Sequence, residues 1–360
     1  MNSRFLIFAA AFVIFVAGAW MALQPPQLQE LPAPSAAAAV APAPAPVSAL
    51  QPQKLDAASV LAIDPRTPGK RPAVPVRQTL TNEYLAARQY RALYDRLKSS
   101  AEGTTAEGAY VLYEIANRCA NITDRPRRNF GNAAKPLEQR RDEFLAGIQP
   151  GDPMRDRRIA AFEEVNTNKC LGFESISMTQ ADLNKMLADA VSLGDPKARA
   201  LAIEQEINAA RRGRWDSGTL SETQIDGLRQ AIGTKDPAAM VLAGRLLSTG
   251  YNDLTMRVGP NGQVAEPRAM YNAWQILACD YGYPCGDTND RLLQACAYQA
   301  HCDASSLPDY LHYYASSPHD SQLIAQYQGL LRTAIESGDW SQLNLVRGPR
   351  PPGAPRVLPR

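Results

Sequence analysis

The pattern of apolar and polar residues divides this chain into four segments. Residues 5–23 form an unbroken apolar run (FLIFAAAFVIFVAGAWMAL) that follows Arg4. Residues 24–77 show no apolar periodicity, whereas residues 78–346 carry apolar residues three and four positions apart almost throughout. Side chains at that spacing lie on one face of an α-helix. The pattern therefore predicts a leader over residues 1–23, a linker over 24–77, an all-α domain over 78–346 and a tail over 347–360.

Local signals inside the domain support the helical prediction. Two apolar helix faces stand out, Tyr90, Leu93 and Leu97 on one helix and Leu112, Ile115, Ala116 and Cys119 on the next. A Ser or Thr followed three residues later by Glu or Gln forms a capping box at a helix start. Thr104 with Glu107 and Ser221 with Gln224 fit this pattern. The exception is residues 257–264, where a Pro-Asn-Gly turn predicts a small β-hairpin inserted between helices.

One junction between helices recurs along the domain, as Gly or Lys followed by Asp at the start of a new helix. The copies are Gly151-Asp152-Pro153, Gly194-Asp195-Pro196, Lys235-Asp236-Pro237, Gly286-Asp287-Thr288 and Gly338-Asp339-Trp340. Gly suits the left-handed residue that ends a helix, Asp caps the next helix, and Pro suits its first turn. The first two intervals between the Asp residues match solenoid repeats of two helices, which are roughly 34–47 residues long. Chance reuse of a common junction is the alternative.

Part of this pattern resembles a known repeat. Residues 236–247 (DPAAMVLAGRLL), which Thr249-Gly250 follow, and residues 267–282 after the hairpin are similar to a Sel1-like repeat, a relative of the tetratricopeptide repeat. Residues 194–202 resemble the start of another copy. In that family small Ala residues let paired helices approach, and Gly closes each helix. The resemblance implies helical hairpins stacked as a short irregular α-solenoid, and a scaffold or adaptor that binds other proteins without chemistry of its own.

The apolar leader predicts export. At about 1.5 Å per residue, residues 5–23 would give roughly 28 Å of helix, enough for a bilayer core. One interpretation is an uncleaved signal anchor, which holds the domain outside the cytoplasm on the inner membrane. The other is a signal peptide cleaved after Ala19, since Ala17-Gly18-Ala19 fits an A-x-A site. The cleaved protein would be periplasmic or secreted.

The linker and the tail have the composition of disordered chain. Residues 24–77 are dominated by Pro and Ala and contain no aromatic residue. Such a segment cannot bury enough surface to fold, and it favours polyproline II. We expect a spacer that lifts the domain off a membrane. The tail over residues 347–360 is basic and rich in Pro.

Six cysteines in an exported domain predict three disulfides. Cys119 and Cys170 stand apart from the others and are expected to pair. The remaining four occur in two phrases of matching spacing, which favours local pairs, Cys279–Cys285 and Cys296–Cys302. A crossed arrangement, Cys279–Cys302 with Cys285–Cys296, stays open. Zinc held by Cys279, Cys285 and Cys296 with Cys302 or His301 is the alternative, although zinc sites usually use closer pairs.

The sequence contains no catalytic motif, and it predicts no catalytic residue, cofactor or metal ion. There are only three histidines, and His312, beside Tyr313, is expected to be a packed or surface residue. The adjacent Glu163 and Glu164 are candidate acids, but neighbouring carboxylates on a helix point to different sides. Arginines cluster at residues 125–128, 140–141, 155–158 and 211–214, although the formal net charge is only +2. These patches predict solubilising surface or contacts with anionic envelope polymers or lipid head groups. Nucleic acid is not expected outside the cytoplasm.

These observations predict a membrane-tethered, extracytoplasmic protein that mediates protein–protein interaction in a cell envelope. The alternative is a cell-envelope enzyme that acts on cell-wall material through acids not identified from the sequence. A structural spacer domain is a third interpretation. A deep cleft with converging carboxylates or histidines would favour the enzyme, whereas a broad surface between paired helices would favour the adaptor.

Overall fold

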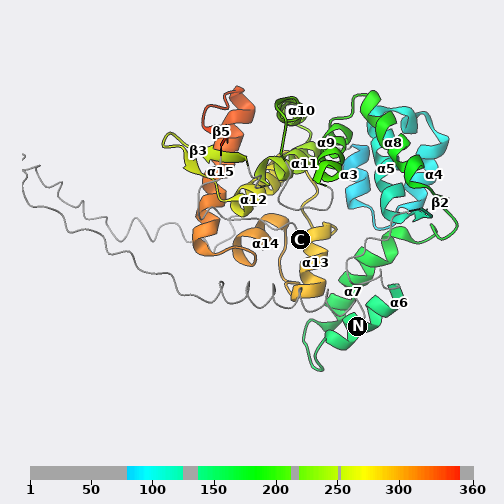
Figure 1. The fold of residues 1–360 in the computed structure, drawn as a ribbon. Helices are drawn as coiled ribbons and strands as arrows, with labels where there is room; N and C mark the ends of the chain where they lie inside the picture. The colour runs from blue at the N-terminus through cyan, green and yellow to red at the C-terminus, as the bar shows by residue number, and fades with distance from the viewer. Residues whose placement is uncertain (1–78, 125–136, 212–218, 250–252, 349–360) are drawn as a thin grey trace, which may run out of the picture. The chain divides into compact units, whose positions relative to one another are not determined.

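The computed structural model describes residues 79–124, 137–211, 219–249 and 253–348 (Figure 1). The predicted leader over residues 1–23 and linker over residues 24–77 lie outside these ranges, as does most of the tail. The described ranges contain thirteen α-helices, labelled α3 to α15, two 3-10 helices and five short strands. The predicted helical class is therefore confirmed. Among the helices of these ranges, none combines the length and apolarity needed to cross a bilayer.

The first helices pack around a core of tyrosine and leucine side chains. They are α3 (Leu80–Ala86), α4 (Arg91–Ser99), the 3-10 helix η1 (Ala101–Thr104) and α5 (Ala106–Cys119). Tyr90, Leu93 and Leu97 are buried, which confirms the first of the two apolar helix faces predicted from the sequence. On α5, Ile115 and Ala116 are fully buried, as the second predicted face requires.

The capping box predicted at Thr104 and Glu107 is wrong by one residue. Thr104 ends η1, and Thr105 caps α5 because its Oγ1 accepts a hydrogen bond from Gly108 N at 3.0 Å. The Glu107 carboxylate instead accepts a hydrogen bond from Thr81 N of α3 at 3.0 Å. The 3-10 turn thus moves the helix start by one position, and Glu107 ties α5 to α3.

Two helical hairpins of the same design follow in the middle of the chain. They are α8 (Gln180–Ser192) with α9 (Pro196–Arg211), and α10 (Glu222–Gly233) with α11 (Pro237–Ser248). In both, a left-handed residue ends the first helix, Gly194 with φ +87° and Lys235 with φ +56°. Asp195 and Asp236 then cap the second helix, each accepting two backbone hydrogen bonds at 2.9 Å. The capping box at Ser221 is also confirmed.

The other three junctions do not begin a helix as predicted. Asp152 accepts a hydrogen bond from Met154 N at 2.8 Å, but α7 (Arg155–Asn166) begins only after Met154. Asp287 is exposed, and Asn289 caps α13 (Asp290–Gln299) in its place. Asp339 follows the end of α15 but leads into a strand. The motif therefore marks a helix start in the two hairpins and a simple turn elsewhere.

The C-terminal helices share an apolar core that includes the fully buried Trp274. They are α12 (Pro267–Asp280), α13, α14 (Leu307–Tyr313) and α15 (Pro318–Ser337). Helix α12 packs against both α11 and α15, and one large apolar core extends from α9 to α15. Helix α7 packs along α13. The Phe144 ring of α6 (Leu137–Gly147) stacks on the Phe162 ring of α7, with the ring centres 4.3 Å apart.

Two small sheets complete the described fold. Strand β3 (Leu254–Val258) pairs antiparallel with β4 (Gln263–Val264), which confirms the hairpin predicted over residues 257–264. A third strand, β5 (Leu343–Arg347), pairs with the other edge of β3 and was not predicted. Arg347, assigned to the tail from the sequence, is thus part of this sheet. Strands β1 (Asn121–Ile122) and β2 (Ser177–Met178) form a separate parallel pair.

Candidate functional site

The cysteines singled out in the sequence form three disulfides, Cys119–Cys170, Cys279–Cys285 and Cys296–Cys302. Their Cα atoms are 5.2, 5.8 and 4.2 Å apart, respectively. The long-range pair and the two local pairs are confirmed, and the crossed arrangement is wrong. Because every cysteine sulfur is held in a disulfide, the alternative zinc site has no thiolate ligand and is wrong as well. The bridges are structural.

Several arginines of the predicted patches form ion pairs with acidic residues of the same chain. Three of these side chains make ion pairs, Arg141–Glu163, Arg157–Asp303 and Arg158–Asp152. The patch at residues 125–128 and residues 212–214 lie outside the described residues. Of the candidate acids, Glu163 is ion-paired, and Glu164 accepts a hydrogen bond from Asn168 Nδ2 at 3.4 Å. These carboxylates therefore serve local contacts on and around α7.

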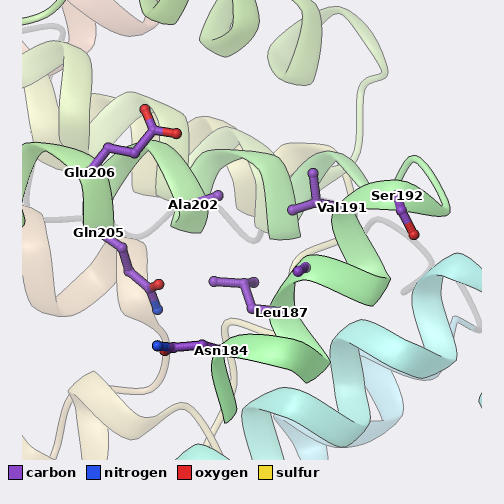
Figure 2. A pocket seen from close by; sticks show the side chains of 8 residues that line it. Asn184, Leu187, Val191, Ser192, Ala202, Gln205 and Glu206 are labelled. Atoms are coloured by element: carbon purple, nitrogen blue, oxygen red, sulfur yellow. The ribbon is translucent and has the colours of Figure 1, made fainter. Parts of the chain in front are cut away.

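A groove lies between α8 and α9, with a volume of about 370 Å³ (Figure 2). Eight residues line it, namely Asn184, Leu187, Ala188, Val191, Ser192, Ala202, Gln205 and Glu206. Figure 2 shows Leu187 between the two helices, with Val191 near their connecting turn. Four of the eight are apolar, and most of the surface inside the groove is contributed by apolar atoms.

Local sequence explains why a hollow forms here. A capping box at Thr179 and Asp182 starts α8, and the turn at Gly194 reverses the chain so that α9 packs beside it. The side chains of Ala188 and Ala202 end at Cβ, so they do not fill the space between the two helices near the surface. The small side chains at these two positions therefore leave a groove between the helices.

The polar side chains on the rim of the groove already have partners. Gln205 Nε2 donates a hydrogen bond to Tyr113 Oη at 3.1 Å, and Glu206 Oε2 accepts one from Gln224 Nε2 at 2.9 Å. Asn184 Oδ1 accepts one from Gln180 Nε2 at 3.0 Å. Glu206 is the one carboxylate among the lining residues. The eight lining residues therefore include no pair of carboxylates or histidines that could act as acid and base.

A second site is a charged cluster around Glu114 of α5, which sequence reasoning missed. Glu114 is half-buried. Burial raises the pKa of its carboxyl to about 7, although Arg118 and Arg245 oppose the shift, and Glu204 adds to it. Arg245 is ion-paired with Glu204, and Tyr84 hydrogen-bonds to Glu114. The cluster thus holds two carboxylates and two guanidinium groups from three helices.

One sequence signal could have pointed to this cluster. Tyr110, Glu114 and Arg118 recur every four residues and therefore share one stripe of α5. Tyr110 is buried at 5% exposure, so this end of the stripe faces the interior, and burial raises the pKa of Tyr110 well above its usual value. A carboxylate in a buried stripe is a candidate for a perturbed pKa.

Comparison with known proteins does not identify a relative. No protein-family model matches the sequence, and no significant match was found among curated proteins or solved structures. Function must therefore be argued from the groove between α8 and α9 and from the Glu114 cluster.

Proposed function

We propose that this protein is a membrane-tethered, extracytoplasmic scaffold that binds other envelope proteins through the groove between α8 and α9. Residues 5–23 provide the tether and residues 24–77 the spacer. Three disulfides support an oxidising compartment such as the periplasm, because thiols stay reduced in the cytosol. Cleavage after Ala19 would leave the same domain free in that compartment.

The two central hairpins support a repeat architecture of the Sel1-like or tetratricopeptide kind. Asp195 and Asp236 occupy equivalent positions, each at the start of the second helix of a hairpin. Lys197 joins them, because its Nζ lies 3.0 Å from Asp195 Oδ2 and 2.9 Å from Asp236 Oδ2. Helix α9 also packs against both helices of the next hairpin. This is the contact that a short irregular α-solenoid requires, since each repeat is stabilised by its neighbours.

The groove is the observation that carries the proposed function. Its apolar floor and hydrogen-bonded rim favour a partner that presents small apolar side chains, such as one face of a helix. Leu193, which follows α8 directly, is an exposed apolar side chain next in sequence to Ser192 of the lining. The volume of about 370 Å³ is enough for a few side chains rather than a whole domain. The partner is therefore expected to dock a short segment here.

The test compares two exposed alanines of α8. Ala188→Glu places a charge in the groove, whereas Ala181→Glu places the same charge in the first turn of the helix, outside the groove. Full-length protein carrying each change is used to capture partners from detergent-solubilised envelopes, with quantitative mass spectrometry. We expect Ala188→Glu to reduce recovery of a specific partner by about tenfold or more, as for loss of an interface centre. Equal recovery with both variants, or no specific partner, would contradict the proposal.

A second function, an envelope enzyme, is favoured only by the Glu114 cluster. A carboxyl with a pKa near 7 is matched to general acid catalysis at neutral pH, and Glu204 is a second carboxylate nearby. The substrate class to test is cell-wall material. Hydrolysis that Glu114→Gln slows by about 100-fold or more would support the enzyme. Absence of hydrolysis by the unmodified protein would leave the scaffold as the function.

A further inference from the structure

Two arginines, Arg268 of α12 and Arg291 of α13, make no ion pair with any carboxylate that the structure describes. Arg118, Arg158 and Arg245, by contrast, are all ion-paired. Arg268 Nη2 donates a hydrogen bond to the carbonyl of Ala315 at 2.7 Å. Arg291 Nη2 donates one to the amide oxygen of Asn272 at 3.2 Å. Both acceptors are neutral, so in the described part of the chain no anion balances these two charges.

The guanidinium of Arg291 is held between two aromatic rings. Its Cζ atom lies 5.8 Å from the centre of the Tyr271 ring and 5.9 Å from that of Tyr310. Tyr310 is itself fixed, because its hydroxyl donates to Gln299 Oε1 at 2.9 Å. Asn272, which accepts from Arg291, is 1% exposed. The side chain is therefore pre-positioned, and its orientation does not depend on a ligand.

Arg291 retains unused hydrogen-bonding capacity. Its Nη1 atom is shielded from solvent and has no acceptor among the described residues. Burial lowers the pKa of Arg291, and the positive charge of Arg268 lowers it further. An arginine nevertheless stays protonated in proteins. Arg268 lies one turn before Asn272 on α12. Its acceptor Ala315 donates a backbone hydrogen bond to Tyr310, so both charges lie against the same parts of α12 and α14. A buried donor and an uncompensated charge are both unfavourable unless an anion satisfies them.

We propose that Arg268 and Arg291 together bind a phosphate group, with Tyr271 and Tyr310 as the flanking walls. Arg268 is exposed and Arg291 half-buried, so the group would approach from the side of Arg268. Guanidinium groups match phosphate oxygens with paired hydrogen bonds. The charge of a phosphate monoester at pH 7, about −1.5 to −2, also balances two arginines, whereas one carboxylate does not. This site is separate from the groove between α8 and α9 and does not depend on it.

The experiment titrates full-length protein in detergent with inorganic phosphate, by calorimetry at constant ionic strength. Acetate serves as the carboxylate probe. We expect saturable phosphate binding that Arg268→Gln weakens by about tenfold or more, since one charge-assisted contact is lost. Arg199→Gln is the matched control, because Arg199 is also exposed and bonds only to the neutral Gln230. Arg291→Lys keeps the positive charge but loses the planar guanidinium with its paired donors. This variant should also bind phosphate more weakly, while its circular dichroism spectrum stays unchanged.

Three results would overturn the phosphate site. They are the absence of saturable phosphate binding, equal affinity for acetate and phosphate, and unchanged binding by Arg268→Gln. The source of the phosphate is identified by competition. Displacement by vesicles that contain phosphatidic acid would place the group on a lipid, and displacement by a sugar phosphate alone would place it on a soluble ligand. Both of these outcomes support the site.

Discussion

Lys169 Nζ lies 2.6 Å from Asp290 Oδ1, although 121 residues separate the two in sequence. Lys169 belongs to the 3-10 helix η2 (Asn168–Cys170) and is 1% exposed, while Asp290 begins α13. Arg118 of α5 binds the other carboxylate oxygen. Burial alone would raise the pKa of Asp290, but the two cations outweigh it and hold this pKa below its usual value. One carboxylate thus joins the N-terminal helices to α13.

Removing the charge of Asp290 should therefore destabilise the domain strongly. Asp290→Asn leaves Lys169 buried without an anion, and breaking a buried pair costs about 3–5 kcal/mol. We expect the free energy of unfolding, measured in urea at pH 7, to fall by about 3 kcal/mol. This is the lower end of the range because the Asp290 side chain is 35% exposed. Because the pKa is lowered in the folded state, this stabilisation is present above about pH 4 and lost as the pH falls further.

The matched control is Asp287→Asn, three residues earlier. The Asp287 side chain is 86% exposed, and its Oδ2 atom lies 3.5 Å from Nη2 of Arg88, which is exposed as well. An ion pair of this kind contributes about 0–1 kcal/mol. A loss of stability with Asp287→Asn as large as with Asp290→Asn would show that burial is not the cause.

The disulfide Cys119–Cys170 should stabilise the domain more than either local disulfide. Its cysteines directly follow Arg118 and Lys169, so the bridge also holds both cations in place for Asp290. It spans 51 residues, whereas Cys296–Cys302 spans 6. In the chain-entropy model these loops correspond to about 4 and about 2 kcal/mol, respectively. Urea unfolding of the two double Cys→Ser variants measures the difference, and a reversed order would contradict the prediction.

Close contact between α11 and α12 depends on glycine at position 244. A Cβ atom there would clash with the ring of Trp274, which is fully buried and cannot move aside freely. Gly244→Ala should destabilise the domain by about 1–3 kcal/mol through overpacking. Gly329→Ala in α15 is the control, because nothing lies within 4 Å of the added atom. That change should stabilise by up to about 1 kcal/mol through helix propensity, and thermal unfolding distinguishes the two outcomes.

Features set by neighbouring residues were predictable from the sequence. At Asp195 and Asp236, a left-handed residue, a capping carboxylate and Pro act within four positions, and both helices begin as expected. Asp287 shows the limit of this reasoning. Asn289, two residues later, caps α13 and also donates from Nδ2 to the carbonyl of Pro284 at 2.9 Å. A competing cap with one more hydrogen bond decides where that helix starts.

The disulfide Cys119–Cys170 apart, features that depend on how distant segments pack were not predictable. Strand β5 forms because residues 343–347 pair with residues 254–258, and nothing local in either segment identifies the other. The Glu114 cluster is similar, since its character comes from Tyr84 of α3, Glu204 of α9 and Arg245 of α11. In isolation Glu114 is an ordinary helix residue. Only the packing of those helices partly shields it from water and brings the charged groups around it.

The raised pKa of Glu114 should make stability depend on pH between about 4.5 and 7. The groups that face it are Tyr84, Tyr90, Tyr110, Tyr283, Arg118, Arg245 and Glu204. Burial raises the pKa of Glu114 from 4.5 to about 7, so in this window the folded state binds a proton that the unfolded state does not. Stability contributed by this group therefore falls as the pH rises through the window and is constant above it.

Glu114→Gln should remove this dependence, because the amide resembles the protonated carboxyl. Relative to the unmodified protein, we expect the variant to gain stability at pH 8, by at most about 3 kcal/mol, and little at pH 4.5. Urea unfolding at both pH values measures the change. Glu206→Gln is the control, since Glu206 is exposed and the same charge is removed outside the cluster. If both variants keep the pH dependence of the unmodified protein, Glu114 is not protonated in the folded state at neutral pH, and the enzyme alternative loses its general acid.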